Sequence, residues 1–267
     1  MADVLNAIVA GARRSAEERM RIKPLAEMER LAAPLRPRGA AFRAALCADG
    51  VQVIAECKRR SPSRGVLRPD YDAAVIAAGY ARAGAAGLSV LTESAFFDGS
   101  LQHLRDVRAA VTTPVLRKDF VVTDYQIAEA RAAGADAVLL IVAALSSGEL
   151  ARLLRYATDL GLMALVEVHD AGELPVAVDA GADTIGVNSR NLKTLDVDTG
   201  LFERLVHQIP DAAVAVAESG IRTADDIRRL RAIGYDAFLI GERFMTDADP
   251  GASLAALRSA AAAGSMA

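Results

Sequence analysis

The sequence predicts an α/β protein, a (β/α)8 TIM barrel with an N-terminal helical extension. A glycine-centred joint occurs four times, starting at residues 83, 133, 180 and 233, and another apolar run precedes or separates the joints each time. An interval of about 50 residues is too long for one strand–helix unit and suits two, so the chain contains eight strand candidates. Alternation of strand and helix indicates a parallel sheet, and eight repeats favour closure into a barrel.

An open, doubly wound sheet is the alternative architecture for the same alternation. Its usual dinucleotide-binding form has a GxGxxG turn after the first strand, and no such turn follows "VQVIAE" here. The closed barrel is therefore the preferred fold. We expect a single barrel domain over residues 1–267, in which residues 1–47 form the extension.

The extension is expected to be helical and to pack over one end of the barrel. Apolar spacing predicts an amphipathic helix over residues 4–20 and a second helix over residues 24–32. Pro34, Pro37 and Gly39 are expected to interrupt helical structure after that point. Forty-seven residues of this kind are too few for an independent domain.

The repeating units follow in order after the extension. Each joint contains a glycine expected to end a helix, followed by an apolar strand. Helical patterning is clearest over residues 70–84 and 223–234, and Thr223 is expected to cap the second of these. The expected strands lie within residues 51–56, 83–91, 114–120, 133–141, 162–168, 180–187, 213–219 and 233–240.

Composition excludes several classes of function. The 31 basic and 34 acidic residues are mixed along the chain and give a net charge of −3, so nucleic acid is not an expected partner. The apolar run over residues 137–145 is far shorter than the roughly 18 residues of a membrane span. The N-terminus lacks the pattern of a signal peptide, which predicts a cytoplasmic protein. Two isolated cysteines and three scattered histidines predict neither a disulfide nor a metal site.

Polar side chains gather where the expected strands end, which is where barrels of this type carry their reactive groups. Strand parity places Glu56 and Lys58 on the same face as Ile54, and Lys118 on the same face as Leu116. Opposed lysine and glutamate groups in a partly dry mouth are expected to have pKa values shifted toward neutrality, as acid–base catalysis requires. The candidate residues at this rim are Glu56, Lys58, Lys118, Phe120, Glu167, Asn188, Arg190, Glu218, Ser219, Gly220, Gly241 and Glu242.

Two short motifs indicate a phosphate site. "ESGI" at residues 218–221 and "IGERF" at residues 240–244 place small residues after the seventh and eighth strands, where barrels often bind phosphate. Ser61, in the "SPSRG" loop, adds a hydroxyl to this side. A phosphorylated small molecule is therefore the expected ligand.

The chain contains, in this order, the motifs "VIAECKRRSPSRG", "LSVLTE", "FFDGSLQHLRDVR", "PVLRKDF", "DYQIAEARAAGADAVLLIVAAL", "LVEVH", "GVNSRNLKTLDVD", "AESGI" and "FLIGERFM". Together they resemble one enzyme family, that of indole-3-glycerol phosphate synthase. The resemblance runs from about residue 5 to residue 257. The N-terminal segment also resembles the family's helical extension, which helps to cover the mouth of the barrel.

The resemblance implies a carboxy-lyase of tryptophan biosynthesis. The reaction closes the indole ring of 1-(2-carboxyphenylamino)-1-deoxyribulose 5-phosphate with loss of CO2 and water, and it needs no metal or organic cofactor. Contact with other enzymes of that pathway is not addressed by the sequence.

The resemblance also implies roles for individual residues. Lys118 is the implied general acid, Glu167 the acid or base of the later dehydration, and Lys58, held by Glu56, a carboxylate-binding group that assists proton transfer. Asn188 and Arg190 are implied to position the carboxylate and hydroxyl groups of the substrate. The implied phosphate residues are Ser61, Ser219, Gly220, Gly241 and Glu242.

Other interpretations remain open from the residues alone. A phosphosugar isomerase on a similar barrel, such as phosphoribosylanthranilate isomerase, relies on a Cys/Asp pair where this rim supplies Lys and Glu. A non-catalytic barrel that binds a phosphosugar is the second alternative. Glu218 is interpreted as a partner of a reacting group, and His169 and Cys57 as packing residues without functional partners.

Two positions depart from the family's pattern. Ser189 stands where the family often has a second asparagine, and parity turns Ser189 away from the site. Glu242 places an acid beside the expected phosphate, which is acceptable only if its carboxylate is directed elsewhere.

Overall fold

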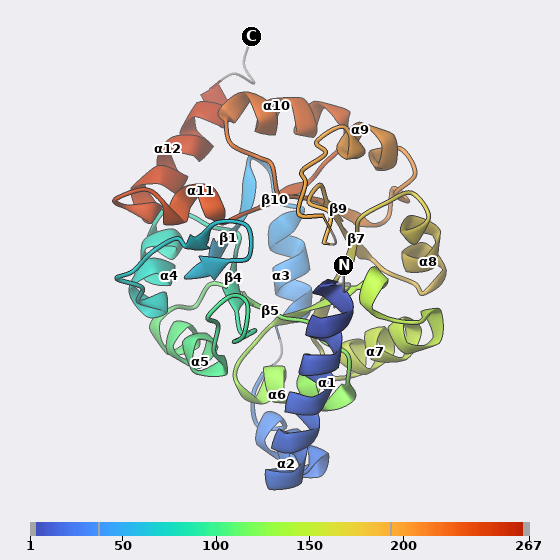
Figure 1. Ribbon diagram of the computed structural model, residues 1–267. Coiled ribbons are helices and arrows are strands. Elements are labelled where there is room, and N and C mark those ends of the chain that lie inside the picture. Colours follow the sequence, from blue (N-terminus) through green and yellow to red (C-terminus); the bar gives the residue numbers. More distant parts are fainter. Residues whose placement is uncertain (1–3, 37, 193, 264–267) are drawn as a thin grey trace.

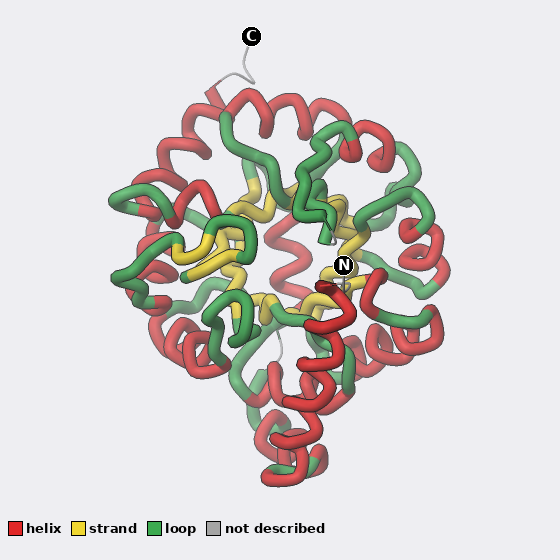
Figure 2. Tube along the Cα trace, in the orientation of Figure 1, coloured by secondary structure: helices red, strands yellow, loops and turns green. Residues whose placement is uncertain are grey.

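Eight parallel strands close into a barrel in the computed structural model, which describes residues 4–36, 38–192 and 194–263. The first strand pairs with both the second and the last, so the ring has no open edge (Figure 2). The predicted barrel is thus confirmed, and the open sheet is wrong. The strands are β1 (Gln52–Cys57), β4 (Gly87–Leu91), β5 (Val115–Lys118), β6 (Ala137–Ile141), β7 (Met163–Val168), β8 (Thr184–Asn188), β9 (Val214–Glu218) and β10 (Ala237–Ile240).

Helices surround the barrel, one or more after each strand (Figure 1). Side chains that accept a hydrogen bond from the first turn set the starts of α4, α5, α6, α7 and α10. Thr223, at the start of α10, forms a capping box with Asp226 as its partner. The four joint glycines have φ angles between 79° and 115°, as expected for helix ends. The outer helices are α4 (Ala73–Arg82), α5 (Leu101–Ala110), α6 (Asp124–Ala132), α7 (Ser147–Asp159), α8 (Glu173–Asp179), α9 (Leu201–Val206), α10 (Ala224–Ile233), α11 (Glu242–Met245) and α12 (Pro250–Ala263), with a 3-10 turn at η1 (Val142–Ala144).

Two apolar layers follow from strand alternation. Residues such as Ile54 and Leu116 point into the barrel and pack together, whereas their neighbours Val53 and Val115 pack against the surrounding helices. Cys57 belongs to the outer layer, where parity places it. Its thiol has a pKa raised above its ordinary value, first by burial and then by the charge of Glu56, so it is an inert packing residue.

The N-terminal segment contains three helices rather than the two predicted. α1 (Val4–Ile22) and α2 (Leu25–Ala32) agree with the sequence patterns, and both pack beside α6 (Figure 1). α3 (Gly39–Leu46) was not predicted, because Gly39 was interpreted as a helix breaker. Residues 1–3 and Pro37 lie outside the described residues.

α3 fills the end of the barrel opposite the rim. Phe42 and Leu46 are fully buried and join the inner apolar layer. Gly39 is the first residue of the helix. A larger residue does not fit there, because a Cβ atom would lie 2.3 Å from the backbone nitrogen of Met163. The glycine therefore permits close contact between the helix and β7.

The "SPSRG" segment is more regular than the loop that the sequence predicts. β2 (Arg60–Ser61) and β3 (Gly65–Val66) form a short antiparallel hairpin that projects from the end of β1. Its turn holds Ser63 and Arg64 over the barrel mouth.

No helix within the described ranges is both long enough and apolar enough to cross a membrane.

We predict that Gly39→Ala lowers the free energy of unfolding by about 3 kcal/mol, because the added methyl group meets backbone atoms that cannot rotate away. Denaturant unfolding followed by circular dichroism measures this change. Gly11→Ala is the matched control, since Gly11 lies within α1 and a Cβ atom there meets nothing within 4 Å. The control is expected to stabilise the chain by about 0.5–1 kcal/mol. Equal effects of the two substitutions would contradict the packing argument.

Candidate functional site

A cavity of about 490 Å³ opens at the C-terminal ends of the strands. Every candidate residue named from the sequence lines it, although the residues come from six of the eight strands and their loops. Strand parity and barrel closure together produce this convergence. These residues are Glu56, Lys58, Ser61, Lys118, Phe120, Glu167, Asn188, Arg190, Glu218, Ser219, Gly220, Gly241 and Glu242.

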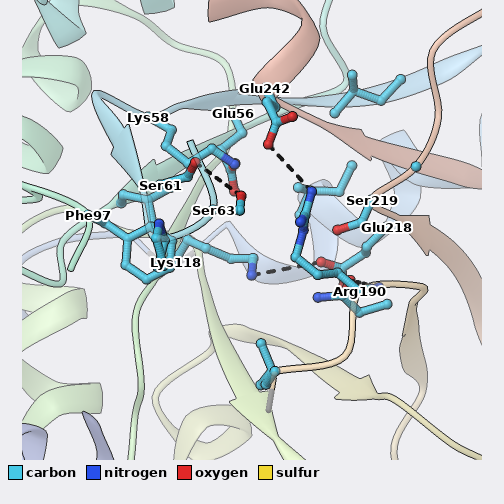
Figure 3. A pocket seen from close by; sticks show the side chains of 18 of the residues that line it. Glu56, Lys58, Ser61, Ser63, Phe97, Lys118, Arg190, Glu218, Ser219 and Glu242 are labelled. Atoms are coloured by element: carbon cyan, nitrogen blue, oxygen red, sulfur yellow. Dashed lines mark hydrogen bonds and ion pairs between the residues drawn. The ribbon is translucent and has the colours of Figure 1, made fainter. Parts of the chain in front are cut away.

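Lys118 lies at the centre of a buried charge cluster. Its Nζ atom is 3.1 Å from Oε2 of Glu167 and 3.9 Å from Oε2 of Glu218. Figure 3 shows the Lys118 side chain extended toward Glu218 across the cavity. Both glutamates are 1% exposed, so water screens these charges weakly.

The three groups influence one another's protonation. Burial is the largest single influence on Lys118 and lowers its pKa, but the charge of Glu167, the neighbouring glutamates and the hydrogen bond to Glu167 together outweigh burial and raise this pKa above its ordinary value. Burial likewise favours neutral Glu167, yet the charge of Lys118 and the contact with His169 bring its pKa below the usual range. Burial and the charge of Glu167 raise the pKa of Glu218 well above normal. At neutral pH the cluster therefore holds a lysine cation, an ionised Glu167 and a protonated Glu218.

This result corrects the expectation that the lysine and glutamate pKa values move toward neutrality. An ion pair stabilises the charged forms of both partners, so it moves the pKa values of Lys118 and Glu167 apart. Glu218 is the group that is shifted upward, because one ammonium cannot neutralise two buried carboxylates.

Glu56 and Lys58 form a second ion pair at the end of β1, with 2.6 Å between Oε1 and Nζ. Their shared strand face brings them together, as the two-residue spacing predicts. Gly241 makes room for this pair, since a Cβ atom there would lie 2.5 Å from Oε1 of Glu56. The ammonium of Lys58 thus faces the cavity with its counter-charge beside it.

Asn188 supports Arg190 at the end of β8. Its Oδ1 atom accepts a hydrogen bond of 3.0 Å from the backbone N–H of Arg190. The Arg190 guanidinium donates to the carbonyl oxygen of Leu195, which holds the following loop over the cavity. Ser189 is buried and does not line the cavity, as its parity predicts.

Small residues from the segments after β1, β9 and β10 form one side of the cavity, which we call the donor-rich side. Ser219 and Gly220 have consecutive left-handed φ angles of 65° and 71°, a backbone geometry that can direct successive N–H groups to one anion. Ser61 contributes its hydroxyl, which lies 3.4 Å from that of Ser63. This side therefore offers several donors to a phosphate.

Glu242 lies between Arg64 and Arg190 rather than turning to solvent. Its Oε1 is 3.0 Å from Nε of Arg64. Its Oε2 is 3.5 Å from Nη2 of Arg190, the pair marked in Figure 3. The carboxylate thus pairs with two of the guanidinium groups that line the cavity. One carboxylate thus links guanidinium groups from two other loops.

Several cavity residues were not identified from the sequence. Leu5 and Ile8 of α1 line one side, together with Phe97 and Leu192. The ring of Phe97 is tilted against that of Phe120, with 6.5 Å between the ring centroids. These residues form an apolar wall suited to an aromatic ring. Arg64 was missed because only the hydroxyl of Ser61 was singled out in the "SPSRG" segment.

His169 is the clearest correction to the sequence interpretation. It was interpreted as a packing residue without a partner, but its Nε2 lies 3.1 Å from Oε1 of Glu167 and its Nδ1 lies 3.4 Å from Oε2 of Glu173. The spacing of two residues from Glu167 was the available signal, since the same rule brought Glu56 and Lys58 together.

Within the described part of the chain, no group of three or more His, Cys, Asp or Glu side chains could hold a metal ion.

We predict that Glu218→Gln leaves the free energy of unfolding at pH 7 unchanged or raises it, because glutamine resembles the protonated acid. At pH values above the pKa of Glu218 in the unfolded chain, this side chain takes up a proton when the chain folds. The contribution of Glu218 to the free energy of unfolding therefore falls as pH rises from about 4.3. The variant should lack this part of the pH dependence. Denaturant unfolding at several pH values measures both effects.

Glu167→Gln is the control for that prediction. It removes the closest counter-charge of Lys118 and is expected to lower the free energy of unfolding by about 1–3 kcal/mol. A destabilisation by Glu218→Gln as large as that by Glu167→Gln would show that Glu218 is ionised.

Solved structures of low sequence identity share the fold. A thiamine phosphate pyrophosphorylase from Pyrococcus furiosus aligns with a TM-score of 0.60 and 19% identity, over 79% of this chain and 95% of that one. KGPDC from Streptococcus mutans aligns with a TM-score of 0.62 and 10% identity, over 80% and 98% of the two chains.

Sequence comparison is more specific. Indole-3-glycerol phosphate synthase 1 of Streptomyces coelicolor is 53% identical over 247 residues, which cover 92% of this chain and 91% of that protein. The indole-3-glycerol phosphate synthase of Chromobacterium violaceum is 44% identical over 263 residues, with 96% and 98% covered. The family model described as indole-3-glycerol phosphate synthase matches residues 5–257. The chain therefore belongs to the indole-3-glycerol phosphate synthase family.

Proposed function

We propose that this chain is a carboxy-lyase that converts 1-(2-carboxyphenylamino)-1-deoxyribulose 5-phosphate to indole-3-glycerol phosphate in tryptophan biosynthesis. One observation supports this function above the others: the ammonium of Lys118 is kept charged by the buried carboxylate of Glu167 and faces the cavity. A cation in this position can donate a proton to a carbonyl oxygen in an environment of low dielectric constant.

The substrate has three parts that suit three sides of the cavity. The phosphate fits the donor-rich side formed by Ser61, Ser219, Gly220, Gly241 and the backbone of Glu242. The aromatic ring fits the wall of Leu5, Ile8, Phe97, Phe120 and Leu192. Its carboxylate is assigned to Lys58 and Arg190, with Asn188 holding the Arg190 loop.

The helical extension is assigned a direct part in binding. Leu5 and Ile8 belong to both the cavity wall and the inner apolar layer, although α1 precedes the barrel in the chain. Ion pairs from Arg13 to Glu149 and from Arg19 to Glu129 hold the helix against α7 and α6. We expect α1 to cover the aromatic end of the bound substrate.

The reaction begins with carbon–carbon bond formation. The ring carbon that carries the carboxylate attacks the ribulose carbonyl carbon while Lys118 gives a proton to the carbonyl oxygen. The bond to the carboxylate then breaks, CO2 leaves, and its electron pair restores the aromatic ring. Loss of the new hydroxyl as water completes the indole. Ionised Glu167 accepts the proton released in this dehydration, and Lys58 assists proton transfer.

This chemistry uses only side chains, so we expect neither a metal nor an organic cofactor. The substrate and product are small phosphorylated molecules, and the enzyme is assigned to the cytoplasm.

The test is to mix the purified chain with the carboxyphenylamino-deoxyribulose phosphate, in the presence of a chelator, and to follow indole fluorescence. Formation of product supports the proposed lyase. Tight binding without product would favour a phosphosugar-binding protein, and isomerisation of a phosphosugar without ring closure would favour an isomerase.

We predict that Lys118→Ala lowers kcat by about a hundredfold or more while changing KM little, because the general acid acts mainly in the transition state. Steady-state kinetics measures this effect. Lys23→Ala is the matched control, since Lys23 is exposed and distant in the chain from the rim. Near wild-type turnover of Lys118→Ala would reject the assignment.

We predict that Glu242→Gln lowers the Kd for inorganic phosphate severalfold, because the variant no longer neutralises Arg64 and Arg190 or repels the anion. Arg190→Gln should raise that Kd. Calorimetric titration of both variants measures the two changes. Weaker phosphate binding by Glu242→Gln would instead mean that the carboxylate is needed to hold the two arginines in place.

A further inference from the structure

His169 lies outside the cavity but contacts a carboxylate inside it. The residue follows the last residue of β7, and its side chain is only 7% exposed. Nε2 is 3.1 Å from Oε1 of Glu167, and Nδ1 is 3.4 Å from Oε2 of Glu173, at the start of α8. Neither ring nitrogen has the alignment of a full hydrogen bond, so charge is the main interaction.

We infer that His169 is a positioning residue for Glu167: held as an imidazolium between Glu167 and Glu173, it retains Oε1 of Glu167 and leaves Oε2 to face Lys118 and the substrate. This inference rests on the proposed function, because that function makes Glu167 the proton acceptor.

The surroundings of the ring favour its cationic form. A carboxylate faces each of its two nitrogens, from β7 on one side and from α8 on the other. Glu173 is fixed in turn, because its Oε2 also accepts the backbone N–H of His169 at 2.7 Å. Burial favours the neutral ring, but the contacts and charges of Glu167 and Glu173 outweigh burial and raise the pKa of His169 to about 9.

Two further titratable side chains face Glu167 on its cavity side. Lys118 of β5 lies at its Oε2, and protonated Glu218 of β9 faces the same carboxylate. Two cations therefore flank one ionised carboxylate, while Glu173 compensates the outer cation. Loss of the imidazolium proton would leave Glu167 with Lys118 as its single cationic neighbour among the groups that face it.

The arrangement assigns different tasks to the two oxygens of Glu167. Oε1 points to His169, which does not line the cavity, so a substrate proton does not reach this oxygen first. Oε2 is the oxygen beside Lys118, where the reacting bonds are proposed to lie. An ion pair at Oε1 restricts rotation of the carboxylate and keeps Oε2 in its orientation.

Histidine titration by NMR tests the charge state without substrate. The chain has three histidines, and the His169→Gln spectrum identifies the signal of His169. We expect His169 to stay protonated up to about pH 9 in the wild type. In Glu173→Gln its midpoint should move to lower pH, because one of the two facing carboxylates is lost. A wild-type midpoint near the ordinary value of about 6.5 would overturn the inference.

Steady-state kinetics tests the positioning role. We expect His169→Gln to lower kcat between about tenfold and a hundredfold while KM changes less than about twofold. Wild-type kcat should fall as pH rises through about 9, where the imidazolium is lost, and His169→Gln should lack this alkaline limb. His207→Gln is the matched control, since His207 is exposed and lies outside the cavity.

Glu173→Gln separates positioning from simple packing. Glutamine can still accept the His169 backbone N–H, and Glu173 does not line the cavity. At pH 6 the kcat of Glu173→Gln should equal that of the wild type. As pH rises, this kcat should begin to fall at a lower pH than the wild-type kcat does. An unchanged pH profile would contradict the inference, even if His169→Gln failed to fold. Absence of product from the wild type would reject the proposed function instead, and the NMR titration would still decide the charge state of His169.

Discussion

Barrel closure imposes one constraint on which the site depends: alternate residues of every strand must point inward. Deep in the barrel these inward positions are uncharged and mostly apolar, and α3 fills the far end with Phe42 and Leu46. Charged side chains can occupy only the last inward positions, where the barrel opens. Glu56, Lys118 and Glu167 all lie at such positions. Concentration of charge at the rim is thus a consequence of the fold.

The charges at the rim are arranged to compensate one another without water. One ammonium cannot neutralise two buried carboxylates, so Glu218 takes a proton while Glu167 stays ionised beside Lys118. His169 adds a cation on the side of Glu167 that the cavity does not reach. A stable acid and a stable base therefore coexist 3.1 Å apart, which neither side chain could achieve if buried alone.

The loops add charged binding groups that also pair with one another. Glu242 pairs with Arg64 from the hairpin after β1 and with Arg190 from the loop after β8. An anion that enters this side competes with Glu242 for both guanidinium groups. The carboxylate that looked unfavourable in the sequence thus prevents two unpaired cations from repelling each other across the mouth.

The sequence by itself determined the eight strands, the parity of the rim residues and the family, because these depend on local periodicity and on ordered motifs. It also placed Glu56 beside Lys58, which are neighbours on one strand face. Only the tertiary structure decided the helix at Gly39, which requires contact with β7, and the partners of His169 and Glu242, which come from other elements. Protonation was also a tertiary outcome. It depends on the distances among side chains from different strands and on how completely they exclude water, and neither quantity is written in local sequence.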